Sequence, residues 1–231
     1  PRAKIRDITN GYDARLFRPD PSLPMPPEFT KAPDGAMKLL TVRRLNPKNG
    51  IHILVQALAL VRDRNPRFHY FVIGDGLVWD FIEELIAEYR MEKHITLLGA
   101  RTNDALQPYY QHADLVLMPS SAEATSITCI EAMGMEKPVI ASKVGGLIEL
   151  IGRDHRYGTL VDIYESEACT YDPPMRLPTA KLQPLTDAIL AFLGTPIPFQ
   201  EKAKHASAHV REHFSWETIA RQYIELYARL M

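Results

Sequence analysis

Cysteine is scarce in this 231-residue chain, which contains only Cys129 and Cys169. Two thiols are too few for a zinc framework or for a scaffold held together by disulfides. Disulfide-rich folds belong to oxidising compartments, so we expect this chain to work in the reducing cytoplasm. Cys129 lies in an apolar stretch, and we expect it in the core.

An excess of charge and a long apolar run are also missing. The 27 basic and 28 acidic residues leave a formal net charge of −1. A nucleic-acid-binding domain usually carries a basic surplus or stripe, so this balance argues against a nucleic-acid partner. No segment approaches the roughly 20 apolar residues that a membrane-spanning helix needs. With 46% hydrophobic residues, the composition is typical of a globular protein with a full core.

Patterns of metal ligands are absent as well. No two aspartates stand two positions apart, and the eight histidines show no ligand spacing. Metal sites usually draw on several such side chains at recognisable spacings. We therefore expect neither a metal ion nor another cofactor.

What the sequence does contain is a repeated alternation of short apolar runs and segments with helical periodicity. The predicted strands are 37–42, 68–73, 95–98, 115–118, 139–141 and 158–161. The predicted helices are 50–64, 77–89, 106–112, one beginning between 123 and 131, 145–151, 185–192, 199–213 and 216–230. This pattern predicts an α/β fold with a doubly wound, parallel, six-stranded Rossmann-like sheet, followed by C-terminal helices.

Three segments lie outside this alternation. Residues 1–36 combine turn residues with a run of prolines, which predicts a connector leading into a domain of residues 37–198. Residues 163–184 contain four prolines, and such a segment is an insertion, a functional loop or disordered. Residues 199–231 are predicted C-terminal helices, and the last of them has an apolar side that must pack against something.

Two glutamates eight residues apart, Glu123 and Glu131, are the main candidates for function. Glu123 follows the predicted strand 115–118, so we expect it at the carboxyl edge of the sheet, where open α/β folds bind ligands. Glu131 is expected early in the following helix, near backbone N–H groups that favour anions. The alternative is that both are ordinary acidic residues near a helix start.

Several short motifs occur in the order found in one enzyme family. They are Asn10-Gly11-Tyr12-Asp13, Arg44-Leu45 with Gly50-Ile51, Gly74-Asp75-Gly76, Ala113-Asp114 with Pro119-Ser120, the two glutamates with Ala132-Met133, Lys137-Pro138-Val139-Ile140, Gly145-Gly146 and Phe214-Ser215-Trp216-Glu217. Together they resemble the carboxyl-terminal, nucleotide-sugar-binding half of a retaining family 4 glycosyltransferase of the GT-B fold. Each motif alone is weak evidence, but their shared order along nearly the whole chain is specific.

The resemblance implies transfer of a sugar from a nucleoside-diphosphate sugar to a hydroxyl group with retained configuration, in the synthesis of a polysaccharide, glycolipid or other glycoconjugate. It also implies a missing N-terminal acceptor domain, onto which residues 199–231 would pack and through which the protein could associate peripherally with a membrane. This chain would then be the donor-binding half, inactive alone. Because Asp-x-Asp is absent, cations and helix N-termini are expected to stabilise the departing diphosphate.

The family match assigns the diphosphate to cations at the end of the first strand. Arg44 corresponds to the family arginine and is expected to contact the diphosphate in catalysis. The alternative is a solvated strand-end residue, as its neighbour Arg43 is expected to be. The family lysine stands directly before the glycine that corresponds to Gly50, where this chain has Asn49. Lys48, one residue earlier, is the candidate replacement.

The same resemblance assigns the residues around the two glutamates. The backbone amides of Thr125, Ser126 and Ile127 would hold the distal phosphate at a helix N-terminus, although Ser126 is equally typical of a plain N-cap. Glu131 would accept hydrogen bonds from the ribose hydroxyls. Glu123 would face the donor sugar as a catalytic residue, without acting as a nucleophile.

Three more positions complete the predicted donor site. Gly74 would let the backbone pass close to the cleft, or simply form a turn after a strand. Leu98 and Arg101 match the region that lines the nucleobase, although Arg101 is also typical of a surface residue. Two other functions stay open: a GT-B relative with different chemistry, such as a nucleotide-sugar epimerase, and a non-catalytic nucleotide-binding or assembly module.

Overall fold

The computed structural model describes residues 5–164 and 180–230. At its centre lies a six-stranded sheet in which all neighbouring strands are parallel, in the order β3-β2-β1-β4-β5-β6. The strands are β1 (Met37–Val42), β2 (Phe68–Ile73), β3 (Ile95–Leu97), β4 (Leu115–Met118), β5 (Val139–Ser142) and β6 (Thr159–Val161). The predicted doubly wound α/β fold is confirmed, with every strand end within one residue of its predicted position.

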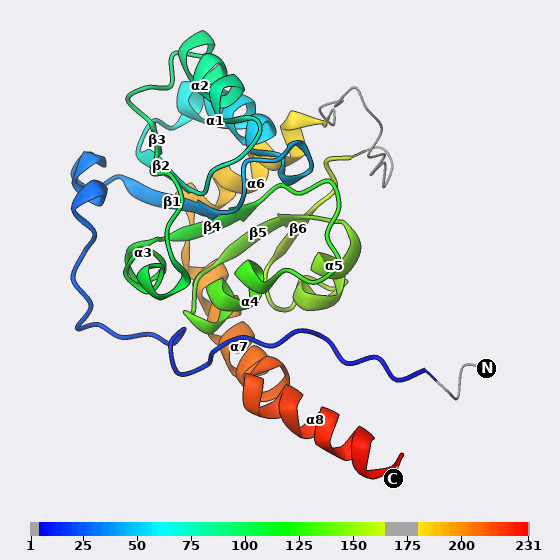
Figure 1. Ribbon diagram of the computed structural model, residues 1–231. Coiled ribbons are helices and arrows are strands. Elements are labelled where there is room, and N and C mark those ends of the chain that lie inside the picture. The colour runs from blue at the N-terminus through cyan, green and yellow to red at the C-terminus, as the bar shows by residue number, and fades with distance from the viewer. Residues whose placement is uncertain (1–4, 165–179, 231) are drawn as a thin grey trace.

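Helices cover both faces of the sheet (Figure 1). One face is covered by α1, α2 and α6, and the other by α3, α4, α5 and α7. The helices are α1 (Ile51–Arg64), α2 (Trp79–Glu88), α3 (Gln107–His112), α4 (Ile127–Gly134), α5 (Gly145–Ile151), α6 (Leu182–Gly194), α7 (Ile197–Phe214) and α8 (Trp216–Ala228). Short 3-10 helices are η2 (Pro27–Lys31), η3 (Pro47–Asn49) and η4 (Asn103–Ala105).

The sheet is buried on both faces because successive strand residues point to opposite sides and most of them are apolar. In β1, Leu39 packs with the layer of α1, α2 and α6, whereas Leu40 packs with the opposite layer. In β4, Leu117 and Val116 divide in the same way. Parallel strands between two helical layers therefore appear in the sequence as continuous apolar runs.

Helix α6 begins earlier than predicted. The expected helix 185–192 is observed as Leu182–Gly194, with Pro184 in its first turn. A proline in this turn removes no helical hydrogen bond, because the first N–H groups have no partner within the helix. The predicted end of the insertion at residue 184 is therefore wrong. Residues 165–179 of that segment lie outside the described residues.

The predicted connector packs against the domain along much of its length. Phe17 and Phe29 are each 1% exposed and belong to the core between the sheet and α4. The Phe29 ring stacks on Phe71 of β2, with 4.3 Å between the ring centroids. The proline-rich lead-in is therefore a fixed part of the second helical layer.

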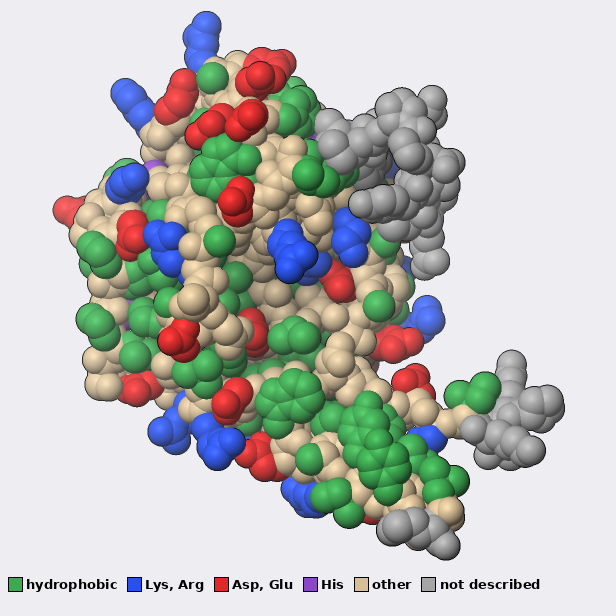
Figure 2. All heavy atoms as spheres, in the orientation of Figure 1, with side chains coloured by type: hydrophobic (Ala, Val, Ile, Leu, Met, Phe, Trp, Pro, Cys, Tyr) green, Lys and Arg blue, Asp and Glu red, His purple; other side chains and the backbone are tan. Residues whose placement is uncertain are grey.

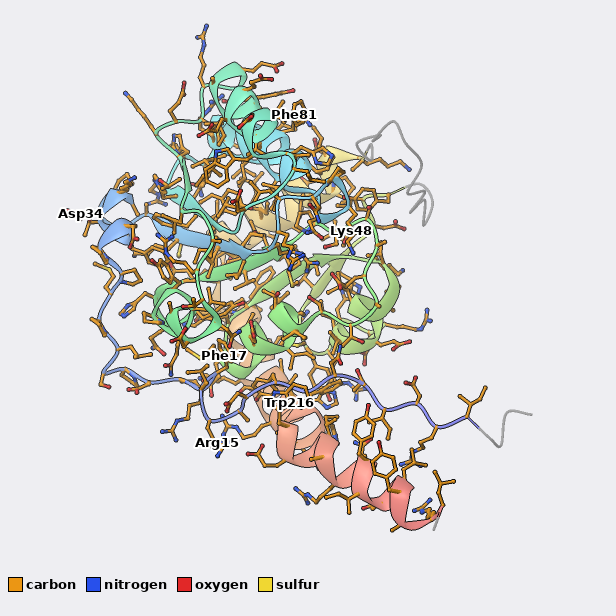
Figure 3. The ribbon with its side chains drawn as sticks, viewed as in Figure 1. Arg15, Phe17, Asp34, Lys48, Phe81 and Trp216 are labelled. Atoms are coloured by element: carbon orange, nitrogen blue, oxygen red, sulfur yellow. The ribbon has the colours of Figure 1, made fainter. Side chains whose placement is uncertain are left out.

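Near its start, the connector is joined to the junction of α7 and α8. Tyr12 forms a parallel β-bridge with Ser215. Its N–H donates to the Phe214 carbonyl at 2.9 Å, and its carbonyl accepts from the Trp216 N–H at 3.0 Å. Figure 3 shows Trp216 where the N-terminal segment crosses the start of α8. The Tyr12 ring also packs over Gly134, where a Cβ atom would lie 2.5 Å from Tyr12 Cε2.

Helix α7 packs within the sheet domain. It contacts α4, and its residues Ala203, Ala206 and Val210 are buried. The boundary predicted at residue 198 therefore falls inside a helix that is integral to the second layer, and α8 alone projects from the body (Figure 1).

Helix α8 exposes an apolar face. Ile219 is its only buried residue, and Figure 2 shows hydrophobic side chains gathered over this helix. The exposed ones are Trp216 at 49%, Tyr223 at 41%, Ile224 at 65%, Tyr227 at 59% and, just beyond the helix, Leu230 at 75%. None of the helices within residues 5–164 and 180–230 is both long and apolar enough to span a bilayer.

Candidate functional site

The strand order reverses between β1 and β4, which are neighbours in the sheet. In open α/β sheets, the loops at the carboxyl ends on either side of such a reversal diverge and leave a crevice for ligands. The segment after β1 carries Arg43, Arg44 and Lys48, and the segment after β4 carries Glu123. A hollow of about 310 Å³ opens between them. It is lined by Lys48, Ser121, Ala122, Glu123, Ala124, Val144 and Gly145.

Close packing of two backbones shapes one wall of this hollow. Gly145 and Gly146 begin α5, and the Gly146 N–H donates to the Glu123 carbonyl at 2.8 Å. A Cβ atom on Gly145 would lie 2.0 Å from the Glu123 carbonyl oxygen, and one on Gly146 would lie 1.6 Å from that of Ala124. No larger residue fits unless the loop moves, so this glycine pair determines where the Glu123 backbone lies.

A buried ion pair joins the two sides of the reversal. The Arg43 guanidinium contacts the Glu123 carboxylate, and the two side chains are only 9% and 10% exposed. Arg43 also donates to Ser126 Oγ and to Asn49 Oδ1, both at 3.1 Å. Asn49 in turn donates to the Arg44 carbonyl at 2.6 Å. Arg43 is thus not the incidental surface charge expected from the sequence, but the centre of a hydrogen-bonded network.

The second glutamate, Glu131, is buried in α4 and only 4% exposed. One carboxylate oxygen accepts from Asn103 Nδ2 at 2.9 Å, and the other accepts from the Tyr110 hydroxyl at 3.2 Å. Burial raises the pKa of Glu131, while these two hydrogen bonds oppose the rise. Two carboxylate oxygens offer about four acceptor positions, so the group can still accept from further donors. A buried carboxyl group with a perturbed pKa near a crevice is typical of a functional site.

The N-terminus of α4 lies between the two glutamates along the chain. Ser126 is its N-cap, since the side-chain oxygen accepts from the Cys129 N–H at 3.3 Å. Thr125 Oγ1 lies 3.4 Å from Thr9 Oγ1 of the connector. Ile127 is the first helical residue and is 41% exposed. The N-cap interpretation of Ser126 is confirmed, and Cys129 is a core residue as predicted.

The two predicted phosphate cations, Arg44 and Lys48, are exposed at the carboxyl edge. Within the described part of the chain, neither side chain has a hydrogen-bond or ion-pair partner, in contrast to Arg43. Lys48 lines the hollow, and Figure 3 places it near the middle of the face on which Figure 2 shows a group of basic side chains. Both cations are therefore available to an incoming anion.

The other predicted positions lie at the ends of β2 and β3. Gly74 has φ +143°, and a Cβ atom there would lie 1.8 Å from the Arg43 carbonyl oxygen, so the glycine permits a close approach of two backbones. Leu98 is partly buried against the second layer of the core. Arg101 pairs with Glu28 at 3.2 Å. Its guanidinium is thus held by the connector, although the side chain is still 32% exposed.

Sequence reasoning missed three residues of this site: Arg43, Asn103 and Tyr110. Arg43 and its neighbour look alike in the sequence, and only the folded structure distinguishes them: Arg43 contacts Glu123, whereas Arg44 is exposed. Asn103 and Tyr110 precede Glu131 by 28 and 21 residues. One signal could have found them: both lie in the segment after a predicted strand, at the same edge of the sheet.

Comparisons with known proteins show what the chain is similar to. The sequence profile of a family described as "Glycosyl transferases group 1" matches residues 27–170. D-inositol 3-phosphate glycosyltransferase of Corynebacterium urealyticum is 29% identical over 99% of this chain and 55% of its own. Sucrose-phosphate synthase of Thermosynechococcus elongatus has a TM-score of 0.79 and 28% identity, over 97% of this chain and 52% of that one.

A third relative was solved with ligands. HepE of Anabaena, crystallised in complex with UDP and glucose, has a TM-score of 0.78 and 27% identity, over 96% of this chain and 56% of its own. The chain spans about half the length of the curated relatives it matches.

Proposed function

The chain belongs to the glycosyl transferases group 1 family, and from this premise we propose that it is the donor-binding part of a retaining glycosyltransferase. It would transfer a sugar from a nucleoside-diphosphate sugar to a hydroxyl acceptor, in the synthesis of a polysaccharide, glycolipid or other glycoconjugate. The observation that carries the proposal is the pair of glutamates, one partly buried at the hollow between β1 and β4 and one buried in the adjoining helix.

Glu131 is proposed to hold the ribose. Its carboxylate is fixed from one side by Asn103 and Tyr110 and retains acceptor capacity for the two hydroxyl groups of a ribose. Acidic residues hold the ribose in the same way in other dinucleotide sites at this edge of an α/β sheet. Leu98 and Arg101, at the end of β3, are proposed to lie along the nucleobase.

The diphosphate is proposed to bind between the exposed cations and the N-terminus of α4. Arg44 and Lys48 supply mobile positive charge, and the amides of residues 125–127 supply fixed dipoles. During transfer, negative charge grows on the departing diphosphate, and groups already oriented toward it stabilise the transition state. The sequence has no Asp-x-Asp pair, so we propose that these groups act without a metal ion.

Glu123 is proposed to face the donor sugar. The residue lines the hollow, and its carboxylate is held by the ion pair with Arg43. In this position it would orient the sugar hydroxyls and stabilise positive charge that develops near the anomeric carbon. The backbone contact with Gly145 and Gly146 limits how far the residue can move.

The acceptor is proposed to bind to a second domain that is not part of this chain. The exposed apolar face of α8 supports this, because such a face is typical of a contact surface. The chain alone would then bind the donor but transfer nothing. Its cytoplasmic location and any peripheral attachment to a membrane remain predictions.

Titration tests this function directly. UDP-glucose, ADP-glucose, GDP-mannose and UDP-N-acetylglucosamine are each titrated into the chain by calorimetry, and at least one is expected to bind below millimolar concentration. Glu131→Ala and Arg44→Ala should weaken that binding. Arg64→Ala is the control, because Arg64 is exposed at the far end of α1, about 20 Å along the helix from the hollow.

Absence of binding by all four nucleotide sugars would count against a donor site. A non-catalytic nucleotide-binding module is the second candidate. It is favoured because two residues predicted to bind the donor, Arg101 and Thr125, contact residues of the connector. It gains support if a full-length protein binds the donor yet releases no free nucleoside diphosphate with any acceptor.

A further inference from the structure

We propose that Arg43 is a positioning residue of the donor site. Through its buried ion pair it neutralises Glu123, and through Ser126 it fixes the start of α4, so that a nucleoside diphosphate can approach a carboxylate that would otherwise repel it. This inference rests on the proposed function and adds a residue that neither the motifs nor the comparisons assign.

The geometry of Arg43 indicates that it acts through its neighbours. Its terminal nitrogens contact three acceptors on two segments: Glu123 and Ser126 between β4 and α4, and Asn49 after β1. The side chain is 9% exposed and does not line the hollow, whereas Glu123 does. A ligand in the hollow would thus meet Glu123, whereas Arg43 is outside the lining.

The charge of the hollow explains why Glu123 needs this partner. The residues that line it include one acidic residue, Glu123, and one basic residue, Lys48. A nucleoside-diphosphate sugar brings two negative charges, and like charges at contact distance in a partly buried site repel strongly. A cation directly behind the carboxylate offsets this repulsion without occupying the space that the ligand needs.

The planar guanidinium is the right group for this task. It presents donors in a fixed fork, so one side chain can hold a carboxylate and two further acceptors at once. Asn49 holds the fork in place, because its amide accepts from Arg43 and donates to the Arg44 carbonyl. A lysine has a single ammonium on a flexible stem and would keep the charge but lose this geometry.

The arrangement also restrains the loop that carries Glu123. Arg43 follows β1, and both Glu123 and Ser126 belong to the segment between β4 and α4. The guanidinium therefore ties that segment to the neighbouring strand across the reversal of strand order. The Gly146 N–H holds the same segment from the α5 side. Glu123 is thus fixed at its side chain by one element and at its backbone by another.

A double-mutant cycle tests the inference. Affinity for the tightest binder among the four nucleotide sugars is measured by calorimetry for wild type, Arg43→Gln, Glu123→Gln and the double variant. Arg43→Gln leaves the Glu123 carboxylate unpaired, and we expect nucleotide-sugar affinity to fall roughly tenfold or more. A change of this size corresponds to the interaction energy usual for two residues in contact. In the double variant the repulsive charge is gone, and affinity should return to within about threefold of Glu123→Gln.

The conservative variant and a control pair complete the design. Arg43→Lys keeps the charge and is expected to fall between wild type and Arg43→Gln. Arg64 and Asp187 form an ion pair that is 59% and 57% exposed and lies away from the hollow. The cycle of Arg64→Gln and Asp187→Asn should show no coupling in nucleotide-sugar affinity. Thermal melts check that each variant is folded. If Arg43→Gln does not fold, Arg43→Lys takes its place in the double-mutant cycle with Glu123→Gln.

Two results would overturn the inference. If Arg43→Gln and the double variant lose affinity equally, Arg43 contacts the ligand itself or acts only on stability. If Arg43→Gln binds as wild type does, the ion pair is irrelevant to the donor. Both results leave the proposed function intact, because the wild-type chain still binds. Failure of wild type to bind any of the four compounds would instead remove the proposed function, and the inference with it.

Discussion

Gly146 offers a strong test of how the hollow is built. Replacement by alanine would place Cβ 1.6 Å from the Ala124 carbonyl oxygen, whereas ordinary contact begins at 3.4 Å. The two backbones must therefore separate by about 1.8 Å, the difference between these distances. Such a shift also breaks the 2.8 Å hydrogen bond from the Gly146 N–H to Glu123.

The loss of folding stability can be calculated from these two effects. Overpacking typically costs about 1–3 kcal/mol, and loss of a backbone hydrogen bond about 0.5–1.5 kcal/mol. At about 2–4 °C per kcal/mol for a chain of this size, Gly146→Ala should lower Tm by about 3–18 °C. The displaced loop should also weaken nucleotide-sugar binding, because Glu123 moves with it.

Differential scanning calorimetry and a titration measure both effects. Gly194→Ala is the matched control, since Gly194 ends α6 and a Cβ atom there meets nothing within 4 Å. Alanine at this site should leave binding unchanged and raise stability by at most about 1 kcal/mol. A Gly146→Ala protein that melts within 2 °C of wild type (roughly the effect of 1 kcal/mol) and binds normally would refute the proposed packing of the two loops.

Three further predictions concern the buried groups. Burial raises the pKa of Glu131, so its ionisation removes stability as pH rises through the folded-state pKa. From pH 5 to 8, the Tm of Glu131→Gln should therefore fall less than the Tm of wild type, and parallel Tm curves would contradict this. The same variant should bind nucleotide sugars more weakly than wild type. Gly134→Ala should lower Tm by several degrees, because its Cβ would lie 2.5 Å from Tyr12 Cε2; an unchanged melt would show that the ring is not seated there. Burial lowers the pKa of His69 to about 4, so the unfolded chain binds more protons between pH 6.5 and 4. Wild type should lose stability as pH falls through this window, and His69→Gln should lose less; equal losses, measured by chemical denaturation, would argue against a buried neutral histidine.

Much of the fold could be predicted from the sequence because its strands are buried on both faces. Leu115 to Met118 is a short run of four apolar residues, all buried, which distinguishes it from the amphipathic helices on either side. The start of α6 could not be predicted in this way. Pro184 was interpreted as a break in regular structure, whereas a proline in a first helical turn leaves the helix intact.

The candidate site was less predictable because its chemistry depends on which strands are neighbours. The position of Glu131 in a helix after β4 followed from local pattern alone. Its partners Asn103 and Tyr110 come from the segment after β3, and their place after a predicted strand narrows the candidates without singling them out. Arg43 is paired with Glu123 of the segment after β4, whereas Arg44 is exposed, and this difference depends on β1 and β4 being neighbours in the sheet. A single sequence without aligned relatives does not reveal which distant segments become neighbours.

The bridge between Tyr12 and Ser215 has a mechanical consequence. Two segments far apart in the chain are fastened at one point by hydrogen bonds on both sides of Tyr12, to Phe214 and from Trp216. Sliding of one segment past the other would break both bonds together. The first turn of α8 is fastened to α7 as well, because Thr218 Oγ1 donates to the Glu212 carbonyl at 3.0 Å. The connector lies directly against this turn, since a Cβ atom on Gly11 would lie 2.9 Å from Trp216 Cε3 and 3.1 Å from Ile219 Cγ1. The direction in which α8 presents its exposed face is therefore set at this junction.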